Sequence, residues 1–317
     1  MKRFFSSRKF SVLYGAVLAL FTVYVLLDAF VIPRTYSASE SAASASTQSS
    51  TTTSTSSSSS SSGTAAVSKT GSAVSTDSSY SDDNISITLT TAVVDDTTVY
   101  VADVQVTSLE YLKTALAGAA YGKNITAVTS EIASDNSAIL AINGDYYGGR
   151  SAGYVIRNGV LYRSASAGDD QEDLVIYSDG SFEIIKEGDV TAQELLDKGA
   201  VQVFSFGPGL VENGEVSVTE DEEVGRAKTS NPRTAIGEIS PLHYVLVVAD
   251  GRTSESAGLS LYQLAEYMKS LGVTTAYNLD GGGSSTMYFN GQVVNNPTTN
   301  GTTIKERKVS DIVYVGY

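Results

Sequence analysis

The chain has 317 residues and a formal net charge of −14, with 35 Asp and Glu against 21 Lys and Arg. Such an acidic chain is not expected to bind nucleic acid, because phosphate backbones are bound by basic surfaces. The absence of cysteine excludes disulfides, thiolate metal sites and cysteine nucleophiles, and the single histidine, His243, excludes a zinc site built from several histidines.

An apolar run covers residues 10–32 near the N-terminus. It is long enough to cross a bilayer as a helix, which takes roughly 20 residues. Four basic residues precede it: Lys2, Arg3, Arg8 and Lys9. By the positive-inside rule the N-terminus stays in the cytoplasm and the rest of the chain is exported. A cleaved signal peptide is the alternative, but its apolar region is usually shorter, about 7–15 residues. We therefore predict a cytoplasmic tail and single-pass signal-anchor in the cell membrane over residues 1–34.

Residues 35–83 consist mainly of Ser, Thr and Ala. Such a composition buries too little apolar surface to offset the entropy of ordering, so it predicts a disordered spacer. A Ser-rich stalk without cysteine is typical of Gram-positive surface proteins, and we expect the domain that follows to be extracellular.

Strand patterns dominate the remaining residues, 84–317, which we predict to be one catalytic-type domain. Residues 85–89 and 98–106 alternate as half-buried strands do. We expect a helix within residues 108–118 and a buried strand at 138–144. The tripeptide Arg157-Asn158-Gly159 then predicts a hairpin turn between two short strands.

The C-terminal half alternates strands with helices. Thr191 and Glu194 form a capping box that opens a short helix ending at Gly199. A buried strand at 242–250 is followed by an amphipathic helix at 260–272 with Ser260 as N-cap, then by strands at 275–280 and 309–315. These elements predict an α/β (mixed α+β) fold: a mixed β-sheet with packed helices and several hairpins.

Three acids stand beside glycine at strand ends: Asp145 in 142-INGDYYGGR-150, Asp250 in 249-ADGRT-253 and Asp280 in 278-NLDGGGSSTMYFNG-291. An acid in that position is more often a turn former than a catalyst. Asp250 and Asp280 would nevertheless share one sheet edge if their strands are parallel, and ligands bind at that edge in open α/β sheets. The bare amides and hydroxyls of Gly281, Gly282, Gly283, Ser284 and Ser285 suit an anion.

Two arginines could supply a cation, and the pattern leaves carboxylates as the catalytic groups. Arg233 begins an apolar strand and can fork onto phosphate or carboxylate, or lie on the surface paired with an acid. Arg307 offers the same choice with a weaker functional case. His243 lies in an apolar strand pattern and is expected to be structural, and no Gly-x-Ser-x-Gly elbow is present, so a Ser-His-Asp triad is not expected.

Several linked motifs resemble the phosphodiester glycosidase family, which includes the N-acetylglucosamine-1-phosphodiester α-N-acetylglucosaminidases. They are 141-AINGDYYGGR-150, 205-SFGPGLVENGE-215, 231-NPRTAIG-237, 247–297 around the Asp280 loop, and 306-ERKVSDIVYV-315. The resemblance covers roughly residues 95–317. It implies a hydrolase that cuts between an anomeric sugar carbon and a phosphodiester, with a carbohydrate phosphodiester or a cell-surface polysaccharide as its partner. The chain departs from the animal enzymes in having no cysteine.

With that chemistry in view, Asp280 and Asp145 are the expected catalytic carboxylates, in roles that the sequence leaves open. A separation of about 5–5.5 Å between two such carboxylates indicates retention and about 6.5–9.5 Å indicates inversion. Arg233 and the Gly281–Ser285 loop would hold the phosphate, and Asn143 would orient the sugar. Asp250 and Arg252 are further expected substrate contacts.

No cofactor is expected, and a divalent cation held by the three acids has no ligand signature in the sequence. Two other readings of the site stay open. The first is a non-catalytic module that binds wall glycan or assembles exopolysaccharide. In the second, residues 278–285 form a plain turn.

Overall fold

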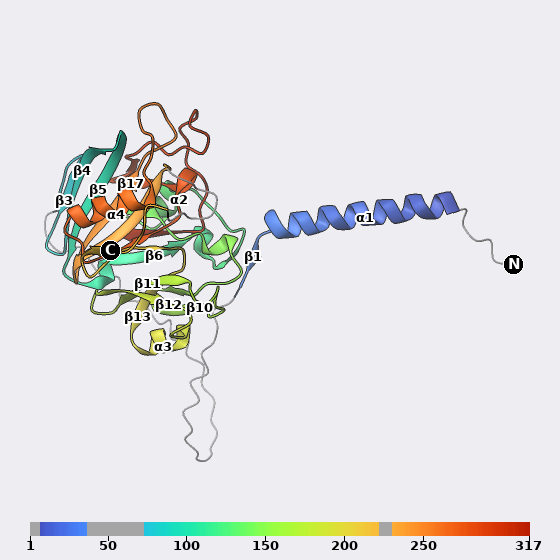
Figure 1. The fold of residues 1–317 in the computed structure, drawn as a ribbon, viewed down its shortest axis with the longest axis horizontal. Helices are drawn as coiled ribbons and strands as arrows, with labels where there is room; N and C mark the ends of the chain where they lie inside the picture. The colour runs from blue at the N-terminus through green and yellow to red at the C-terminus, as the bar shows by residue number, and fades with distance from the viewer. Residues whose placement is uncertain (1–6, 37–72, 222–229) are drawn as a thin grey trace, which may run out of the picture.

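The computed structural model describes residues 7–36, 73–221 and 230–317. In this part of the chain three large β-sheets surround a common core, and a few short helices lie on their outer faces (Figure 1). All strand pairs among the described residues are antiparallel. The predicted fold of β-sheet with packed helices and several hairpins is therefore confirmed, with antiparallel pairing among the described residues where a mixed sheet was expected.

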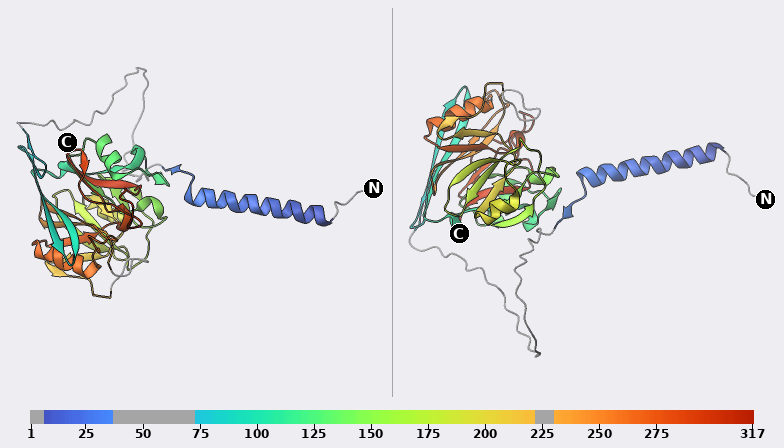
Figure 2. Two further views of the ribbon diagram at one scale, coloured as in Figure 1. Left: turned by 90° about the horizontal axis from the view of Figure 1, so that it is seen from above. Right: turned by 60° about the horizontal axis from the view of Figure 1, so that its bottom comes forward.

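The largest sheet has nine strands in the order β15-β14-β18-β16-β17-β5-β4-β3-β2. In chain order they are β2 (Val74–Ser75), β3 (Ser79–Ser81), β4 (Ile85–Val94), β5 (Thr97–Val106), β14 (Gly209–Glu212), β15 (Glu215–Val216), β16 (Arg233–Ser240), β17 (His243–Ala249) and β18 (Thr275–Asn278). The long β4–β5 hairpin lies on the side of the domain away from the N-terminal helix in every view (Figures 1 and 2).

Two five-stranded sheets complete the body of the domain. One has the order β20-β19-β8-β21-β6 and the other β10-β9-β13-β11-β12. The first contains β6 (Leu112–Leu116), β8 (Leu140–Asn143), β19 (Met287–Phe289), β20 (Gln292–Val293) and β21 (Asp311–Val315). The second contains β9 (Val155–Arg157), β10 (Val160–Arg163), β11 (Glu172–Tyr177), β12 (Phe182–Lys186) and β13 (Ala200–Phe204).

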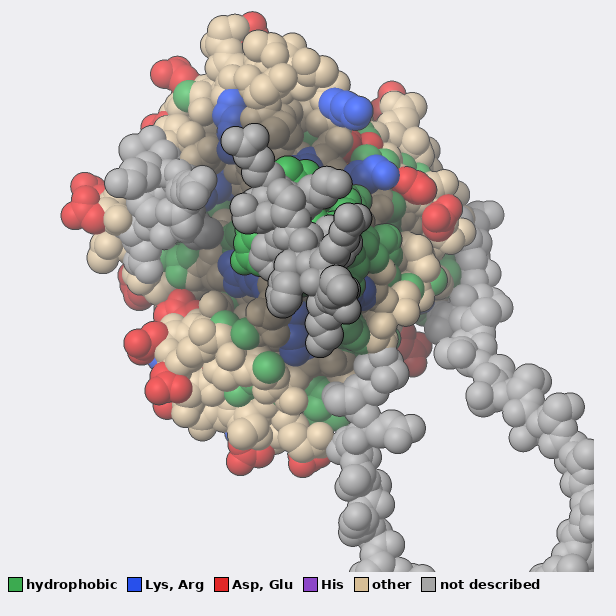
Figure 3. Space-filling view, turned by 90° about the vertical axis from the view of Figure 1, so that its right-hand side faces the viewer, with side chains coloured by type: hydrophobic (Ala, Val, Ile, Leu, Met, Phe, Trp, Pro, Cys, Tyr) green, Lys and Arg blue, Asp and Glu red, His purple; other side chains and the backbone are tan. Residues whose placement is uncertain are grey.

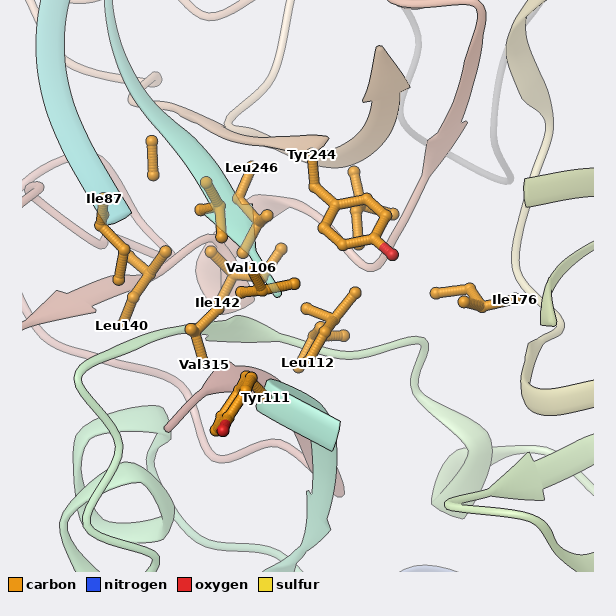
Figure 4. Packing of buried hydrophobic residues seen from close by; sticks show 14 of the residues in the cluster. Ile87, Val106, Tyr111, Leu112, Leu140, Ile142, Ile176, Tyr244, Leu246 and Val315 are labelled. Atoms are coloured by element: carbon orange, nitrogen blue, oxygen red, sulfur yellow. The ribbon is translucent and has the colours of Figure 1, made fainter. Parts of the chain in front are cut away.

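The central core lies between the inner faces of these sheets. Successive side chains of a strand point to opposite faces, so Leu246 of β17 enters this core while its neighbours Val245 and Val247 do not. Tyr244, Ile142 and side chains from all three sheets pack together there (Figure 4). Burial of this apolar surface is the main stabilising contribution to the fold.

Each sheet carries one helix on its outer face. The helix α4 (Leu261–Ser270) covers the nine-stranded sheet, α2 (Thr129–Asp135) covers the sheet that contains β8, and α3 (Ala192–Asp197) covers the sheet that contains β11. The capping box predicted at Thr191 begins α3, and Ser260, predicted as an N-cap, forms a full capping box with Gln263 at the start of α4. The described part of the chain also contains four short 3₁₀ turns: Leu109–Tyr111, Ala117–Ala119, Tyr147–Gly149 and Gly282–Ser284.

The N-terminal helix α1 (Ser7–Phe30) extends away from the domain, and most of its described side chains are exposed (Figure 1). Among the described residues, no helix is long and apolar enough to cross a membrane. Directly after α1, the strand β1 (Arg34–Thr35) pairs with β7 (Gly122–Lys123) of the domain.

Two expectations differ from the structure. The helix expected within residues 108–118 is wrong, because β6 forms there instead and pairs along its whole length with β21, far away in sequence. The expected spacer lies mostly outside the described residues, but its last part contains β2 and β3, which join the nine-stranded sheet. The side chain that explains this is Tyr80 of β3, which is buried in the central core.

Candidate functional site

Three strand ends meet at one edge of the nine-stranded sheet. Both β17 and β18 pair antiparallel with β16, so they run parallel to each other with β16 between them. Arg233, the first residue of β16, pairs with Ala249 at the end of β17. The acids that follow β17 and β18, Asp250 and Asp280, therefore lie at the same edge as Arg233, as expected.

A pocket of about 290 Å³ opens at this edge. We call it the Asp280 pocket. It is lined by one acid, three arginines, two amides and an aromatic ring together with parts of the loop: Phe206, Asn231, Arg233, Arg252, Asn278, Leu279, Asp280, Gly281, Gly282 and Arg307. Among the described residues of the lining, a single carboxylate thus faces three guanidinium groups.

Asp280 is mostly buried, with 12% of its side chain exposed. Its Oδ2 accepts hydrogen bonds from Arg307 Nη2 at 2.8 Å and from Ser284 Oγ at 2.6 Å, and Arg307 Nε donates to the same Ser284 Oγ at 2.8 Å. Burial raises the pKa of Asp280, and the charge of Arg307 together with the Ser284 hydroxyl opposes that rise. The three side chains form a fixed triangle around one carboxylate oxygen.

Arg252 is held by neutral acceptors, and Arg233 also donates to a main-chain carbonyl. Arg252 donates from Nε and Nη2 to Asn231 Oδ1 and from Nη1 to the carbonyl of Thr299 at 2.8 Å. Arg233 donates from Nε to the carbonyl of Leu259 at 2.9 Å. Burial lowers the pKa of Arg252, and the nearby charge of Arg307 lowers it further. An anion placed between these guanidinium groups would relieve their mutual repulsion.

The glycines after Asp280 serve close packing. A Cβ on Gly281 would lie 2.9 Å from the carbonyl oxygen of Pro232, and a Cβ on Gly283 would lie 2.2 Å from Thr299 Oγ1. The amide of Gly282 donates to the carbonyl of Pro232 at 2.8 Å. The amides of Ser284 and Ser285 donate to carbonyls within the loop. Most loop amides are therefore already bonded, and the arginines remain as the principal anion ligands.

Gly281 and Gly282 line the pocket, and the three residues after them lie behind it. Gly283 is buried, and Ser284 holds Asp280 rather than facing the pocket. Ser285 is fully buried, and its hydroxyl has no hydrogen-bond partner among the described residues.

Asn143 lies beneath the site and orients it. Its Nδ2 donates to the main-chain carbonyl of Asp280 at 2.6 Å, and its Oδ1 accepts from Thr234 Oγ1 at 2.8 Å. Since Asn143 is fully buried, these bonds fix the backbone that carries Asp280 instead of contacting a sugar.

Asp145 belongs to a different, fully buried cluster. Its Oδ1 lies 2.8 Å from Arg157 Nη2, which is also 2.9 Å from Asp311 Oδ2. Burial lowers the pKa of Arg157, but the two neighbouring carboxylates raise it by more, so its pKa lies above the ordinary value. Burial raises the pKa of Asp311, and the positive charge of Arg157 opposes that rise. The amides of Tyr147 and Ser205 also donate to the Asp145 carboxylate. The structure thus places Asp145 away from the pocket lining.

Asp250 shares the sheet edge with Asp280 but organises a neighbouring loop. Its two carboxylate oxygens accept hydrogen bonds from the side chains of Asn295 and Asn296 and from the amide of Asn296, at 3.0–3.3 Å. His243 stands at the opposite end of β17 and lies 3.0 Å from Asp103. Both residues therefore have structural partners.

Sequence reasoning missed four residues of the two clusters. Phe206, Asn231 and Asn278 line the pocket, and Arg157 holds the buried acids. Arg157 stands directly before the Asn158-Gly159 turn in an otherwise apolar hairpin, and a charged residue in that position is a signal for a buried ion pair. No local sequence feature indicated that Phe206 lines the pocket. Within the described residues, no group of three or more His, Cys, Asp or Glu side chains could hold a metal ion.

Comparison with known proteins gives the family. The phosphodiester glycosidase model matches residues 136–316. An uncharacterised prophage-derived protein of Bacillus subtilis, YomE, is 32% identical over 184 residues, which is 57% of this chain and 28% of that protein. The mouse N-acetylglucosamine-1-phosphodiester α-N-acetylglucosaminidase is 31% identical over 176 residues, 50% of this chain and 33% of the mouse protein. The chain thus spans about a third of the length of these relatives.

Two solved structures share the fold. The zebrafish N-acetylglucosamine-1-phosphodiester α-N-acetylglucosaminidase catalytic domain, auto-inhibited by its pro-peptide, has a TM-score of 0.59 at 22% identity, covering 74% of this chain and 83% of that one. A hypothetical protein from Synechocystis has a TM-score of 0.53 at 15% identity, covering 74% and 62%. Since the family model matches more than half of its length, the chain belongs to the phosphodiester glycosidase family.

Proposed function

We propose that this protein is a hydrolase that cleaves the bond between the anomeric carbon of a sugar and the oxygen of a phosphodiester, in a linkage of the N-acetylglucosamine-1-phosphate type. The observation that carries the proposal is the Asp280 pocket, in which one buried carboxylate faces three guanidinium groups. The names of the mouse and zebrafish relatives support the choice of sugar and linkage.

The arginines account for the phosphate. Arg233, Arg252 and Arg307 line a pocket in which Asp280 is the single acid among the residues that the structure describes. Guanidinium groups bind phosphate oxygens in pairs and stabilise the charge that develops as the phosphate leaves. A phosphodiester is a good leaving group because its conjugate acid is strong. A second carboxyl group acting as proton donor is therefore not needed, in agreement with the position of Asp145 outside the lining of the Asp280 pocket.

Asn278 and Phe206 account for the sugar. The Oδ1 of Asn278 is buried at the pocket and has no hydrogen-bond partner among the described residues, so it is ready to accept from a sugar hydroxyl or amide. The ring of Phe206 forms an apolar wall of the same pocket. One polar acceptor beside an apolar surface matches the two kinds of face that a sugar ring presents.

Asp280 acts on the anomeric carbon in one of two balanced ways. As nucleophile, a carboxylate oxygen of Asp280 forms a bond to the anomeric carbon. The bond between that carbon and the phosphate oxygen breaks, and its electron pair leaves with the phosphate. Water then hydrolyses the covalent intermediate and releases the sugar. As general base, Asp280 takes a proton from water while the water oxygen makes the new bond. Both routes yield a free sugar and a phosphomonoester of the aglycone.

The position of an oxygen label tests this chemistry. We would incubate the full chain with the methyl diester of N-acetylglucosamine 1-phosphate in ¹⁸O-water, beside the Asp280→Asn variant. We expect free N-acetylglucosamine that carries the label, unlabelled methyl phosphate, and no release by the variant. Label in the phosphate would overturn the proposal, because it reports cleavage of the P–O bond. Binding without release by the parent would favour the non-catalytic glycan-binding module.

The proton signals of the first-formed sugar anomer decide between the two routes. An α-linked substrate that gives the α-anomer first supports Asp280 as nucleophile, and one that gives the β-anomer supports Asp280 as base. The measurement is a time course by nuclear magnetic resonance, read before mutarotation mixes the anomers.

The location is a separate proposal: the domain acts outside the cell on surface glycan or exopolysaccharide. Its support is the apolar run at residues 10–32 with basic residues before it. Intact cells expressing the chain with a C-terminal tag should lose the tag to added protease and keep the chain in the membrane fraction. A tag protected until lysis would overturn this location.

A further inference from the structure

A second pocket, of about 390 Å³, lies beside the Asp280 pocket. We call it the tyrosine pocket. Four tyrosines and three basic side chains form most of its lining: Tyr36, Tyr121, Tyr147, Tyr162, Lys123, Arg150 and Arg163. Its volume falls in the range of roughly 300–1,000 Å³ that is usual for small-molecule sites.

The tyrosine rings form a continuous apolar surface. The ring of Tyr121 stacks on Tyr147 with centroids 5.1 Å apart and meets Tyr162 at 4.8 Å. On its other side lies Tyr36, from the chain directly after β1, at 6.1 Å. Aromatic surfaces of this kind combine an apolar face with a polar hydroxyl, and both features suit a saccharide.

The basic side chains of the tyrosine pocket lack counter-charges. Among the described residues, Lys123, Arg150 and Arg163 make no ion pair. Arg163 donates to the carbonyls of Gly153, Tyr147 and Arg150, but its buried Nη2 has no partner in the same part of the chain. A buried guanidinium donor without an acceptor is costly, and an anionic ligand would supply the acceptor.

The two pockets share a wall. The guanidinium of Arg150, which lines the tyrosine pocket, lies over the ring of Phe206, which lines the Asp280 pocket, at 5.0 Å from its centroid. Arg150 Nη1 also donates to the carbonyl of Ser205 at 3.0 Å, which fixes it against this wall. A ligand that leaves the Asp280 pocket past Phe206 therefore meets Arg150 next.

The positive charge of the two pockets stands out against the rest of the chain. Of the described residues, six basic side chains and one acid, Asp280, line them, although the whole chain has a net charge of −14. Lys and Arg side chains also gather toward the middle of the face from which α1 rises, while most Asp and Glu side chains lie toward its rim (Figure 3). Such focused charge attracts anions to one place on an otherwise repelling surface.

We propose that the tyrosine pocket is a second subsite that binds the next phosphorylated sugar unit of the same substrate, beyond the phosphodiester held in the Asp280 pocket. The tyrosines take the sugar, and Lys123, Arg150 and Arg163 take its phosphate. The substrate class is then a chain of repeated sugar–phosphate units rather than an isolated phosphodiester. This inference rests on the proposed function of the Asp280 pocket.

Three substrates and three variants test the subsite in the full chain. The substrates are the methyl diester of N-acetylglucosamine 1-phosphate, an oligomer in which a second phosphorylated sugar extends the aglycone, and the same oligomer without its second phosphate. The variants are Lys123→Gln, Tyr162→Ala and the control Lys198→Gln, which removes an exposed lysine at a separate pocket. The readout is kcat/KM for sugar release.

We expect the doubly phosphorylated oligomer to exceed the methyl diester at least tenfold in kcat/KM for the parent, and the second phosphate to account for most of this. Lys123→Gln and Tyr162→Ala should each lower that ratio at least threefold, and Lys198→Gln should leave it unchanged. Equal kcat/KM for all three substrates in the parent, or a ratio unaffected by both pocket variants, would overturn the subsite.

Failure of the proposed function gives a different result. If the parent releases no sugar from any substrate, titration calorimetry with the doubly phosphorylated oligomer replaces kinetics. Binding that weakens at least threefold in Lys123→Gln, and not in Lys198→Gln, supports the subsite in a non-catalytic protein. Binding that is absent, or equal in both variants, overturns the subsite.

Discussion

The Asp280 pocket and the Asp145 cluster are built from the same parts but differ in exposure. In both, an aspartate that follows a strand lies 2.8 Å from an arginine nitrogen. The side chain of Arg307 is 41% exposed, whereas that of Arg157 is 2% exposed and has a second carboxylate, Asp311, as partner. Arg157 is therefore neutralised by the protein, while Arg252 beside Asp280 makes no ion pair among the described residues, so its charge is left for an anion.

Burial therefore distinguishes an ion pair that stabilises the fold from one that takes part in the chemistry of the pocket. Removing Arg157 would leave two carboxylates uncompensated where water cannot reach them, at a cost of about 3–5 kcal/mol. Removing Asp280 changes the chemistry that the pocket offers, because the 41% exposed side chain of Arg307 is still solvated by water. The two regions should respond to the same substitution in opposite ways.

The largest effect is expected from exchanging each aspartate for asparagine. Asp280→Asn should lower kcat/KM by at least about a hundredfold, the usual loss with a catalytic acid or base, and keep the melting temperature of the parent. Asp145→Asn leaves Arg157 paired with Asp311, but its new amide group would face one of the buried N–H donors of Tyr147 and Ser205. It should therefore lower the free energy of unfolding by about 1–3 kcal/mol and leave the remaining folded protein active. Chemical denaturation and sugar release measured on the same preparations check both. An Asp145→Asn protein that is as stable as the parent but inactive would contradict a structural role for Asp145 and show that it takes part in catalysis.

A smaller effect is expected at Arg307. Its charge lowers the pKa of Asp280, so Arg307→Gln should raise that pKa further. Since nucleophile and base must both be ionised, activity is lost as pH falls through the pKa of Asp280. The acid limb of the profile of kcat/KM against pH should therefore move to higher pH in Arg307→Gln. The plateau value of kcat/KM should also fall roughly tenfold in this variant. Lys305→Gln, which removes a nearby charge from outside the pocket lining, is the control and should leave the limb in place.

The smallest effect concerns Asp173, a buried acid of β11 that lies outside both sites. Burial, with the charge of Glu187, raises the pKa of Asp173 to about 9. The folded state then holds a proton that the unfolded state loses above about pH 4, so stability falls as pH rises from about 4 to 9, by at most about 1.4 kcal/mol per pH unit. Asp173→Asn should flatten the dependence of the free energy of unfolding on pH in that window. An unchanged slope would show that Asp173 is ionised when folded.

Much of the fold was readable from local signals. The capping boxes at Thr191 and Ser260 marked helices that the structure contains, and the Asn158-Gly159 turn marked the β9–β10 hairpin. The segment 108–118 was misread because its helix-like pattern competes with pairing between β6 and β21, and that pairing depends on residues about two hundred positions away. Local propensity cannot register such a partner.

The sequence predicted the site only to the extent that it predicted which strand ends lie at the same edge of the sheet. The alternation of β17, α4 and β18 placed Asp250 and Asp280 at one edge, where Arg233 also begins β16. Nothing in 142-INGDYYGGR-150 distinguished Asp145 from Asp280, because its partner Arg157 stands in another sheet and its burial results from the packing of all three. Whether an acid is buried depends on how the three sheets pack together, and a local motif does not contain that information. The motifs therefore suggest the same role for both acids.

The pairing of β1 with β7 fixes where the chain after α1 meets the domain. A Cβ on Gly122 would lie 1.8 Å from the carbonyl oxygen of Arg34, so glycine is required for the two backbones to approach this closely. Because β1 begins only four positions after the last residue of α1, this pairing holds the C-terminal end of α1 beside β7. Any larger residue at position 122 would therefore loosen the attachment of α1 to the domain.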